Sequence, residues 1–531
     1  MKRIYFNGQL ITMNDQSREA EALMEENGII KAVGSNEEIL SLKSDDTEMI
    51  DLKGKTMLPA FIDPHSHFFG VANALKQCDL TSASNFDDIV KLMQDFINQK
   101  QIPEGEWVVG SNYDNNFLIE DAHPTKDILD KISTKHKVMI VHASSHMGVA
   151  NSLALASKGI TPETPDPNGG KYGRFPGTNE PNGFMEENAF MSFMEQKPVS
   201  DVSELFSLVK EAQNIYASNG ITTVQDGMVA KPLYDLLSTF AENDLLKLDV
   251  IGYLDLATTR DIMNDPNNPY VKGYHKHFKI GGYKMFLDGS PQGLTAWMST
   301  PYVNQGDYCG YPIHSDEEVY GLIKHAIEDH KQLITHCNGD AAAEQYIREF
   351  EKIKADMHLT DLYRPVMIHA QLVRKDQLER MKQLDMIASF FLAHTYYWGD
   401  IHMKNFGAER GSQISIAQDA AKLGVKYTMH QDSPVVPPNM LKTIWCAVNR
   451  LTRTGKSIGA NQKMNVYDAL KGITINAAYQ YSEEDIKGSL EANKQANYVI
   501  LDQNPMTVNP LDIDKIQVLA TIKQGEVIYQ K

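Results

Sequence analysis

Histidine and acidic side chains follow short apolar runs along the middle of the chain. His65 and His67 come after TMLPAFIDP, while His336, His369 and Asp432 close KQLITH, RPVMIH and VKYTMHQD. A strand places residues i and i+2 on one side, so both imidazoles of the first pair can point at one ion. Imidazole and carboxylate are ligands of zinc and similar divalent metals. The pattern predicts a metal site on the rim where these strands end.

Each of these residues also has an ordinary structural interpretation. The chain has 17 histidines, so an H-x-H pair arises easily by chance. His275 and His277 form another such pair, ahead of their own strand, and we interpret it as a surface pair. An Asp before Ser-Pro commonly starts a turn. The metal site is favoured because several predicted strands each end in a residue of a metal-binding type.

Lys284 lies inside the apolar run FKIGGYKMFLDG, where a charged amine is costly to bury. Its neutral amine can take up CO2 to form a carbamate, which is an anion able to bridge two metals. The alternative is an ordinary ion pair with Asp288 or another acid.

Eight short apolar runs, each followed by a helical segment, organise the middle of the chain. They lie at 56–65, 220–227, 245–255, 278–289, 331–340, 364–371, 386–394 and 425–434. Buried parallel strands are continuous apolar runs of this kind. Eight of them predict an α/β protein, specifically a TIM (β/α)8 barrel over 59–484. An open doubly wound sheet is the alternative, but no Gly-rich phosphate loop follows the first strand.

The two ends of the chain have a different pattern. Residues 1–58 and 485–531 contain short alternating strands with turn signals, and we expect them to form one composite β-sandwich domain. About 150 residues separate the first two barrel strands, far more than a crossover needs. Residues from about 105 to 200 are therefore predicted to be an inserted cap region, at the barrel face that carries active sites.

The charge and cysteine content exclude several classes of protein. The 531 residues carry a net charge of −18 without a basic block, which argues against nucleic acid or an anionic membrane as partner. Four distant cysteines form no disulfide framework. We see no signal peptide or spanning stretch and expect a cytoplasmic protein. The expected partners are a small-molecule substrate and, as one option, a second copy in a homodimer.

These motifs together resemble the amidohydrolase superfamily, and within it the amidohydrolase 3 group. LPAFIDPHSH resembles the strand-one motif, and SSHMGVANSLAL and GFMEENA are similar to motifs of the inserted region. GITTVQDG, KMFLDGS, HCNGDAA, HAQLV and DSPV follow in the family order, so the resemblance covers nearly the whole chain.

The resemblance implies a set of metal ligands. It puts His65 and His67 on one divalent metal, for which we expect zinc, and His336 and His369 on a second. A carboxylated Lys284 would bridge the two ions, and Asp432 would be the acid and base as well as a ligand. One or two ions per chain are expected.

Other polar residues complete the expected site. His146 of the inserted region, Glu187 at the acidic place of its motif, and His394 at the end of strand seven are predicted to bind substrate. Asp340 and Asp288 are predicted to lie next to the metal ligands and to hold them in position. A metal-bound histidine usually donates its other ring N–H to a nearby acceptor.

The chain departs from the group's pattern at two places. His430 and Gln431 stand where Gly-Ser commonly precedes the strand-eight Asp, and strand seven continues into the aromatic FFLAHTYYWGD. Either departure can reshape the pocket, so the substrate cannot be inferred from the family.

The expected reaction is hydrolysis of a C–N bond other than a peptide bond, in an amide or in an N-formyl or N-acyl amine. A metal-activated hydroxide attacks, and Asp432 carries the proton to the leaving amine. Lactone or ester hydrolysis uses the same groups. Related enzymes that deaminate an aminoheterocycle usually carry His-x-x-Glu on strand five. Here Gly339, and not a glutamate, stands three residues after His336. A non-enzymatic scaffold protein usually loses ligands, and this chain retains all six candidates.

Overall fold

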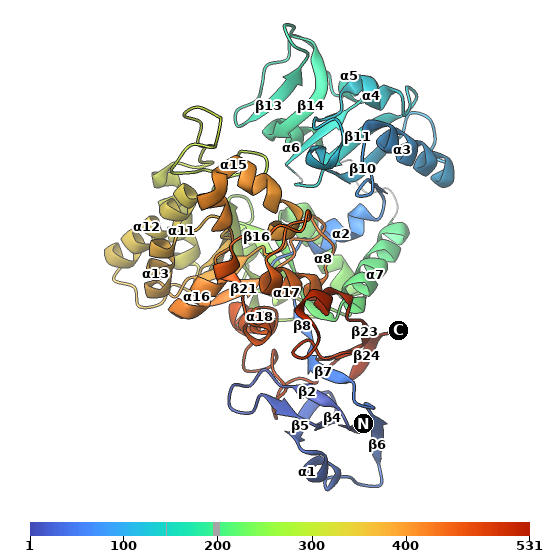
Figure 1. The fold of residues 1–531 in the computed structure, drawn as a ribbon, viewed down its shortest axis with the longest axis vertical. Coiled ribbons are helices and arrows are strands. Elements are labelled where there is room, and N and C mark those ends of the chain that lie inside the picture. Colours follow the sequence, from blue (N-terminus) through green and yellow to red (C-terminus); the bar gives the residue numbers. More distant parts are fainter. Residues whose placement is uncertain (145, 195–201) are drawn as a thin grey trace. The chain divides into compact units, whose positions relative to one another are not determined.

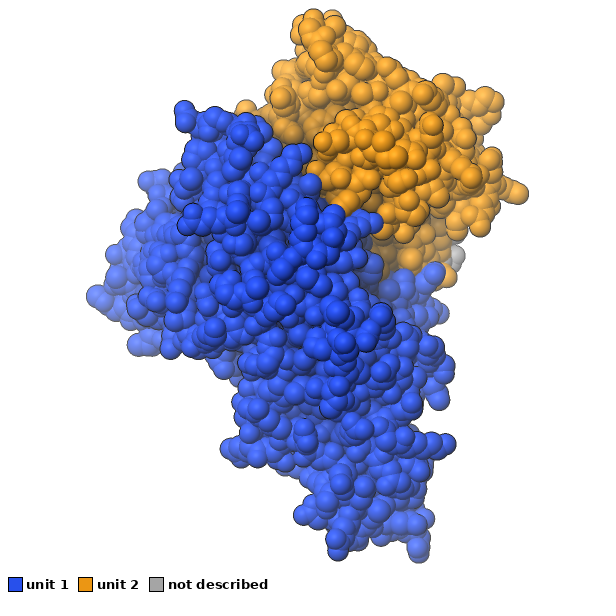
Figure 2. All heavy atoms as spheres, in the orientation of Figure 1, with its two compact units in different colours: residues 1–69, 209–531 blue, residues 70–208 orange. Residues whose placement is uncertain are grey.

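The computed structural model describes residues 1–144, 146–194 and 202–531. Ser145 in the motif at 144–155, and residues 195–200 of the predicted cap region, lie outside the described residues. The chain divides into two compact units, coloured blue and orange in Figure 2. Unit 1 comprises Met1–Phe69 and Val209–Lys531, and unit 2 comprises Gly70–Leu208.

An eight-stranded parallel sheet forms the centre of unit 1 (Figure 1), in the order β21-β20-β19-β18-β17-β16-β15-β8. Its strands are β8 (Phe61–Ile62), β15 (Ile221–Val229), β16 (Asp249–Asp255), β17 (Phe278–Phe286), β18 (Gln332–Cys337), β19 (Val366–His369), β20 (Ile387–Phe390) and β21 (Tyr427–Met429). Each of the eight predicted apolar runs overlaps one of them. Most of their residues are buried, as parallel strands covered on both faces require. The predicted α/β class with a parallel eight-stranded sheet is confirmed.

The sheet curls, which brings the segments after its two edge strands together. The backbone N–H of His67 donates to the carbonyl of Ser433 (N···O 2.8 Å), and that of Asp432 donates to the carbonyl of His65 (3.1 Å). Ile62 of β8 shares one buried cluster with Ile251, Ile334 and Ile387 from other strands of the sheet. The curl therefore places the carboxyl ends of the first and last strands side by side, as in a TIM-type barrel.

Helices follow the strands of this sheet. They are α7 (Val202–Ser218), α8 (Lys231–Glu242), α9 (Arg260–Met263), α10 (Pro269–Lys272), α11 (Asp316–Glu328), α12 (Asp340–Asp356), α13 (Lys375–Gln383), α14 (His394–Tyr397), α15 (Gly399–Ser412), α16 (Ala417–Leu423), α17 (Met440–Asn449), α18 (Val466–Gly472) and α19 (Ile475–Gln480). The sequence explains α11 well, because Ser315 and Glu318 form a capping box and Val319, Ile323 and Ile327 recur on its buried face. None of the described helices is both long enough and apolar enough to cross a membrane.

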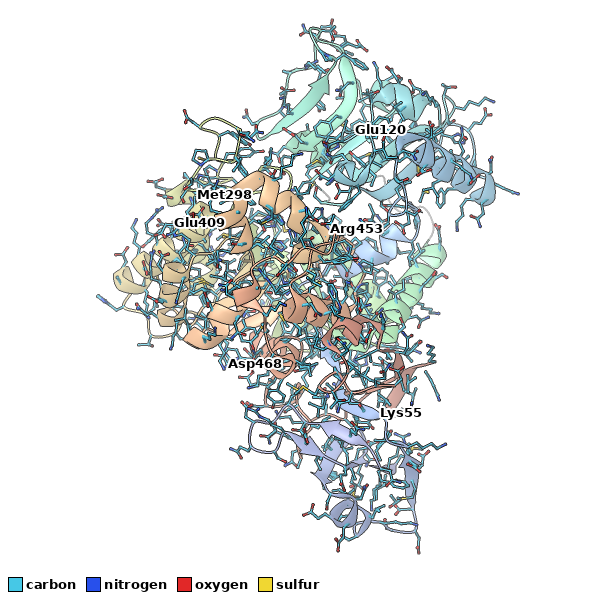
Figure 3. The ribbon with its side chains drawn as sticks, in the orientation of Figure 1. Lys55, Glu120, Met298, Glu409, Arg453 and Asp468 are labelled. Carbon is cyan, nitrogen blue, oxygen red and sulfur yellow. The ribbon has the colours of Figure 1, made fainter. Side chains whose placement is uncertain are left out.

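The long segment between β17 and α11 has a small core of its own. Met298, labelled in Figure 3, packs with Ala296, Tyr302 and Phe406. Arg410 donates to the carbonyls of residues 300 and 301, at 2.8 and 2.6 Å. Phe406 and Arg410 belong to α15, so these contacts tie the segment to that helix.

Both ends of the chain share one sheet, ordered β24-β23-β22-β7-β2-β3. Its strands are β2 (Gln9–Ile11), β3 (Glu19–Ala20), β7 (Thr56–Pro59), β22 (Tyr498–Leu501), β23 (Val518–Lys523) and β24 (Glu526–Gln530). A second sheet, β5-β4-β1-β6, contains β1 (Lys2–Phe6), β4 (Ala22–Glu26), β5 (Ile29–Gly34) and β6 (Thr47–Asp51), with α1 (Asn36–Leu40) between β5 and β6. Tyr5 and Tyr498, one from each sheet, meet in a common buried cluster. That these two sheets together form one composite β-sandwich domain stays a prediction.

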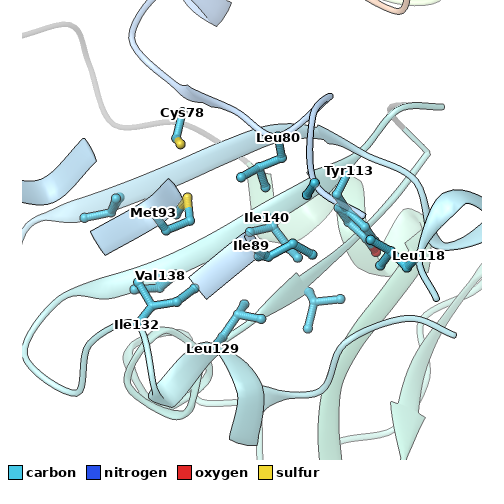
Figure 4. Close-up of a cluster of buried hydrophobic side chains, with 13 residues drawn as sticks. Cys78, Leu80, Ile89, Met93, Tyr113, Leu118, Leu129, Ile132, Val138 and Ile140 are labelled. Atoms are coloured by element: carbon cyan, nitrogen blue, oxygen red, sulfur yellow. The ribbon is translucent and has the colours of Figure 1, made fainter. Parts of the chain in front are cut away.

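Unit 2 has a six-stranded sheet in the order β13-β14-β12-β11-β10-β9. Its elements are α2 (Phe68–Ala74), β9 (Cys78–Asp79), α3 (Phe86–Lys100), β10 (Trp107–Tyr113), α4 (Lys126–Asp130), β11 (Lys137–His142), β12 (Met147–Ala150), α5 (Ser152–Ser157), β13 (Gly170–Arg174), β14 (Pro181–Glu187) and α6 (Asn188–Met194). Ile89 and Met93 of α3 pack in a buried cluster with Val138 and Ile140 of β11 (Figure 4). The unit thus has its own core, which includes residues before 105. The predicted domain boundaries stay predictions.

Candidate metal centre

The candidate ligands lie at the carboxyl ends of strands in the parallel sheet. His65 and His67 follow β8, His336 lies in β18, His369 ends β19 and Asp432 follows β21. The register pairs His336 with Phe286, two residues beyond Lys284 in β17. Parallel strands end at one edge, so these side chains meet there.

His65, His67 and Asp432 form a compact group whose ligand atoms all lie within 4.8 Å of one another. Oδ1 of Asp432 is 3.4 Å from Nε2 of His65 and 3.3 Å from Nε2 of His67. Asp432 adopts a φ of 56°, a left-handed conformation that non-glycine residues rarely take. The backbone hydrogen bond from Asp432 to His65 holds this conformation, which directs the carboxylate between the two rings.

His336 and His369 form a second group beside the first. Nδ1 of His336 lies 3.2 Å from Nε2 of His369, and that Nε2 is 4.0 Å from Oδ2 of Asp432. Nζ of Lys284 is 3.5 Å from Nε2 of His65. The structure therefore brings all six predicted ligands into one cluster, although the metal-ligating role of each stays a prediction.

Gln225 of β15 fixes the orientation of His65. Nδ1 of His65 lies 2.5 Å from Oε1 of Gln225, whose amide nitrogen lies 2.8 Å from the carbonyl of Pro64 and 3.1 Å from the hydroxyl of Tyr481. The amide therefore presents its oxygen to His65 and accepts the Nδ1 proton, so Nε2 turns a lone pair into the cluster. A Cβ at Gly227 would lie 2.5 Å from Cε1 of His65, so only glycine leaves room for the ring.

Burial sets the protonation of the cluster. It lowers the pKa of His65 and of His369 well below the usual imidazole value, and it lowers the pKa of Lys284 to about 7. Burial acts to raise the pKa of Asp432, but contact with His67 and with the other imidazoles outweighs it and holds this pKa well below its usual range. Neutral imidazoles and an ionised carboxylate are the forms that bind a metal.

The unsatisfied atoms of the cluster also fit a cation. Among the described residues, nothing forms a hydrogen bond of good geometry with the buried Oδ1 of Asp432. No described carboxylate forms an ion pair with Lys284, so the alternative pairing with Asp288 does not occur. The donor set of imidazole nitrogen and carboxylate oxygen suits a divalent transition metal.

Asp288 and Asp340 organise the backbone behind the cluster. Asp288 accepts from the backbone N–H groups of Trp297, Asn338 and Gly339 at 2.7 to 3.0 Å, and one of its oxygens is 3.9 Å from Nε2 of His336.

Asp340 accepts from the backbone and hydroxyl of Ser299 and from Arg374 (3.0 Å). Its bonds therefore tie the start of α12 to the loop after β17.

Three further side chains support the site, and the sequence marks only one of them, His430, as a departure from the family pattern. His430 is fully buried, with Nε2 3.1 Å from Nδ1 of His369 and Nδ1 2.8 Å from Oγ of Ser389. Gln225 and Ser389 carry no local signal beyond their place in strands of the sheet, because their role depends on which side chain lies opposite in the fold.

The predicted substrate contacts lie in both units. His394 starts α14, is buried, and has Nδ1 3.0 Å from Nε2 of His402. In unit 2, Nδ1 of His146 lies 2.9 Å from Oε2 of Glu187. Contact of these residues with a substrate stays a prediction.

Comparison with known proteins assigns the family. The profile of the amidohydrolase family matches residues 48–529. The chain belongs to the amidohydrolase family. The expected resemblance is therefore confirmed across almost the full length.

Two relatives match this amidohydrolase over nearly their whole length. It is 25% identical to the Bacillus subtilis (strain 168) protein named "Putative amidohydrolase YtcJ", covering 100% of both chains. It is 26% identical to the N-substituted formamide deformylase of Arthrobacter pascens, covering 99% of this chain and 98% of the relative. An uncharacterized metal-dependent hydrolase of Pyrococcus horikoshii OT3 shares the fold, with a TM-score of 0.77 at 23% identity over 96% and 99% of the two chains.

Proposed function

We propose that this amidohydrolase is a metal-dependent enzyme that hydrolyses the C–N bond of an amide, an N-formyl amine or an N-acyl amine. The observation that carries the proposal is the cluster in which four imidazoles, one carboxylate and one buried amine converge. When bound, a divalent metal, for which we propose zinc, supplies a water of lowered pKa and a Lewis acid for the carbonyl oxygen.

Each residue has a place in this proposal. His65, His67 and Asp432 would hold one ion, and His336 and His369 a second. The second pair has only two protein ligands, so it needs an anionic partner. Lys284, with Nζ 3.5 Å from Nε2 of His65, is the residue proposed to supply it.

The proposed partner is a carbamate on Lys284. The neutral Nζ attacks CO2, an N–C bond forms, and one proton leaves to solvent. The lowered pKa of Lys284, about 7, supports this step because a substantial fraction of the amine is neutral at physiological pH.

Asp432 is proposed to move the proton of the reaction. Its carboxylate takes a proton from the attacking water and delivers it to the leaving nitrogen, because an amide anion is a very poor leaving group. Its Oδ1, which lies within 3.4 Å of Nε2 of both His65 and His67, is directed into the cluster and suited to that role. His394 is proposed to contact the substrate near the end of β20.

The rival reactions have less support. The deaminase pattern needs an acid three residues after the strand-five histidine, where Gly339 stands, and Asp340 is engaged by Ser299 and Arg374. Lactone and ester hydrolysis would use the same groups. The relative named N-substituted formamide deformylase supports C–N chemistry.

The test is a substrate screen on metal-loaded and metal-stripped protein. We expect hydrolysis of N-formyl or N-acyl amines by zinc-loaded protein, its loss after chelation and its return on adding zinc. Turnover of lactones or aminoheterocycles alone would overturn the C–N assignment. Full activity in protein without metal would overturn the metal-dependent mechanism.

A further inference from the structure

Four buried side chains form a continuous line beside the candidate metal centre. Oγ of Ser389 lies 2.8 Å from Nδ1 of His430, Nε2 of His430 lies 3.1 Å from Nδ1 of His369, and Nε2 of His369 lies 3.2 Å from Nδ1 of His336. None of the four is more than 5% exposed. His430 is one of the two residues that stand where the family commonly has Gly-Ser, so this line is a feature of the present chain.

One end of the line meets a backbone carbonyl and a side-chain amide. Nε2 of His336 faces the carbonyl oxygen of Gly289 at 3.3 Å, and a carbonyl can only accept. The amide of Asn338, 3.0 Å from the same Nε2, donates to that oxygen as well. If His336 carries its hydrogen on Nε2, that nitrogen donates to Gly289 and Nδ1 presents a lone pair toward His369. If the hydrogen is on Nδ1, Nε2 accepts from the second amide hydrogen of Asn338 and Nδ1–H donates to Nε2 of His369.

With the hydrogen of His336 on Nε2, the rest of the line can be arranged in two ways. In the first, the Ser389 hydroxyl donates to His430, Nε2–H of His430 donates to His369, and Nε2–H of His369 donates to His336. Every inner lone pair is then used within the line, and neither His336 nor His369 offers a ligand atom.

The second arrangement reverses the hydrogen bonds. Nδ1–H of His369 donates to Nε2 of His430, and Nδ1–H of His430 donates to Oγ of Ser389. Nε2 of His369 and Nδ1 of His336 then both present lone pairs, 3.2 Å apart. Two facing lone pairs at this distance repel unless a cation neutralises them. Both arrangements keep the rings neutral and hold the same number of protons.

We propose that His430 is a positioning residue that, with Ser389, holds His369 in the tautomer whose Nε2 can bind metal. It does so by accepting the Nδ1 proton of His369 and donating its own Nδ1 proton to Ser389. This inference rests on the proposed function, because a cation at the site is what makes use of both facing lone pairs of the second arrangement. Carboxylate or carbonyl partners usually orient a ligating histidine, and here an imidazole and a hydroxyl do so.

The experiment compares variants that keep or remove the acceptor. His430→Gln retains an amide oxygen near the position of Nε2, His430→Leu removes every polar atom, and Ser389→Ala removes the terminal acceptor. His136→Leu is the control, since it deletes a buried imidazole of unit 2 that bonds Ser133 and the carbonyl of residue 102. Each metal-free protein is titrated with zinc by calorimetry, and each cobalt-substituted protein is examined by visible absorption.

We expect His430→Leu to weaken binding of one zinc equivalent by about 10- to 100-fold and to change the cobalt spectrum. Ser389→Ala should weaken the same equivalent by about 10-fold, whereas His430→Gln and His136→Leu should stay close to wild type. If His430→Leu fails to fold, Ser389→Ala carries the test.

Two results would overturn the positioning role while leaving the proposed function intact. One is wild-type zinc affinity and an unchanged cobalt spectrum in both His430→Leu and Ser389→Ala. The other is equal loss in His430→Gln and His430→Leu, which would mean that ring packing matters and the acceptor does not. A wild-type protein that binds no zinc overturns the proposed function, and the positioning role with it.

Discussion

Replacing Lys284 by methionine should stabilise the metal-free protein, although it removes a residue of the proposed site. The side chain is 1% exposed and forms no ion pair with any described carboxylate. Burial lowers its pKa from 10.5 to about 7. At 1.36 kcal/mol per pH unit, burying the charged amine therefore costs about 5 kcal/mol.

The sign of the pH dependence follows from these two pKa values. Between pH 7 and pH 10.5 the unfolded chain keeps the Lys284 proton and the folded chain loses it, so the stability of the folded state rises with pH across this window. Methionine has a similar length and no charge. Lys284→Met should exceed the wild-type stability by about 5 kcal/mol below pH 7 and by about 2 kcal/mol at about pH 9.

The assay is urea unfolding of both proteins at about pH 6.5 and about pH 9, with chelator present and CO2 excluded. Lys487→Met is the matched control. Lys487 is equally buried, but Asp249 (2.7 Å) and Glu483 (3.1 Å) pair with it and raise its pKa to about 12.

The control should change stability in the opposite direction. The pairing of Lys487 stabilises the fold fully below pH 10.5 and is lost as the pH rises through about 12. Its removal leaves two buried carboxylates without this partner and should cost about 3–5 kcal/mol.

One result would refute the reasoning about Lys284. The result would be a Lys284→Met protein that is less stable than wild type at about pH 6.5. Its urea midpoint would also change between the two pH values by the same amount as that of wild type. Together these would show that burying the charged amine costs no stability. If Lys284→Met is the more stable protein without metal, as expected, added zinc should reverse the ranking in favour of wild type, since only wild type retains the proposed bridging residue.

Three other changes test the site and the fold. Gly227→Ala should displace the ring of His65, because its Cβ would lie 2.5 Å from Cε1, and should weaken zinc binding by about 10- to 100-fold in a chelator competition; unchanged affinity would contradict the close contact. Asp432→Asn should lower kcat by about 10²- to 10⁴-fold on whichever amide the screen identifies, and a wild-type kcat would assign the proton transfer elsewhere. Deleting residues 487–531 removes β22, the partner of β7, and should abolish the cooperative melting of the N-terminal strands seen by circular dichroism; a wild-type melting curve would disprove their dependence on the C-terminus.

The strand order and the predicted ligands could be read from local sequence. Buried parallel strands leave continuous apolar runs, and this is why each of the eight runs overlaps a strand of the sheet. Parallel strands also end at one edge, so a polar residue at the end of a run is placed by the topology alone. His65, His336 and His369 therefore meet in the structure although more than 300 residues separate the first from the last.

Other features depend on which side chains the fold places opposite one another. Gln225 accepts the proton of His65 across 160 positions of sequence, and Ser389 meets His430 across 41. Neither pairing has a local signal, because a hydrogen bond between distant residues depends on register and on the curl of the sheet. The low pKa of Lys284 differs, because its place inside an apolar run already predicts a costly charge, whereas only the fold decides that no described acid pairs with it. Sequence thus determined which residues lie on the rim, whereas tertiary packing alone decided their tautomers, their charges and the atoms they turn toward the site.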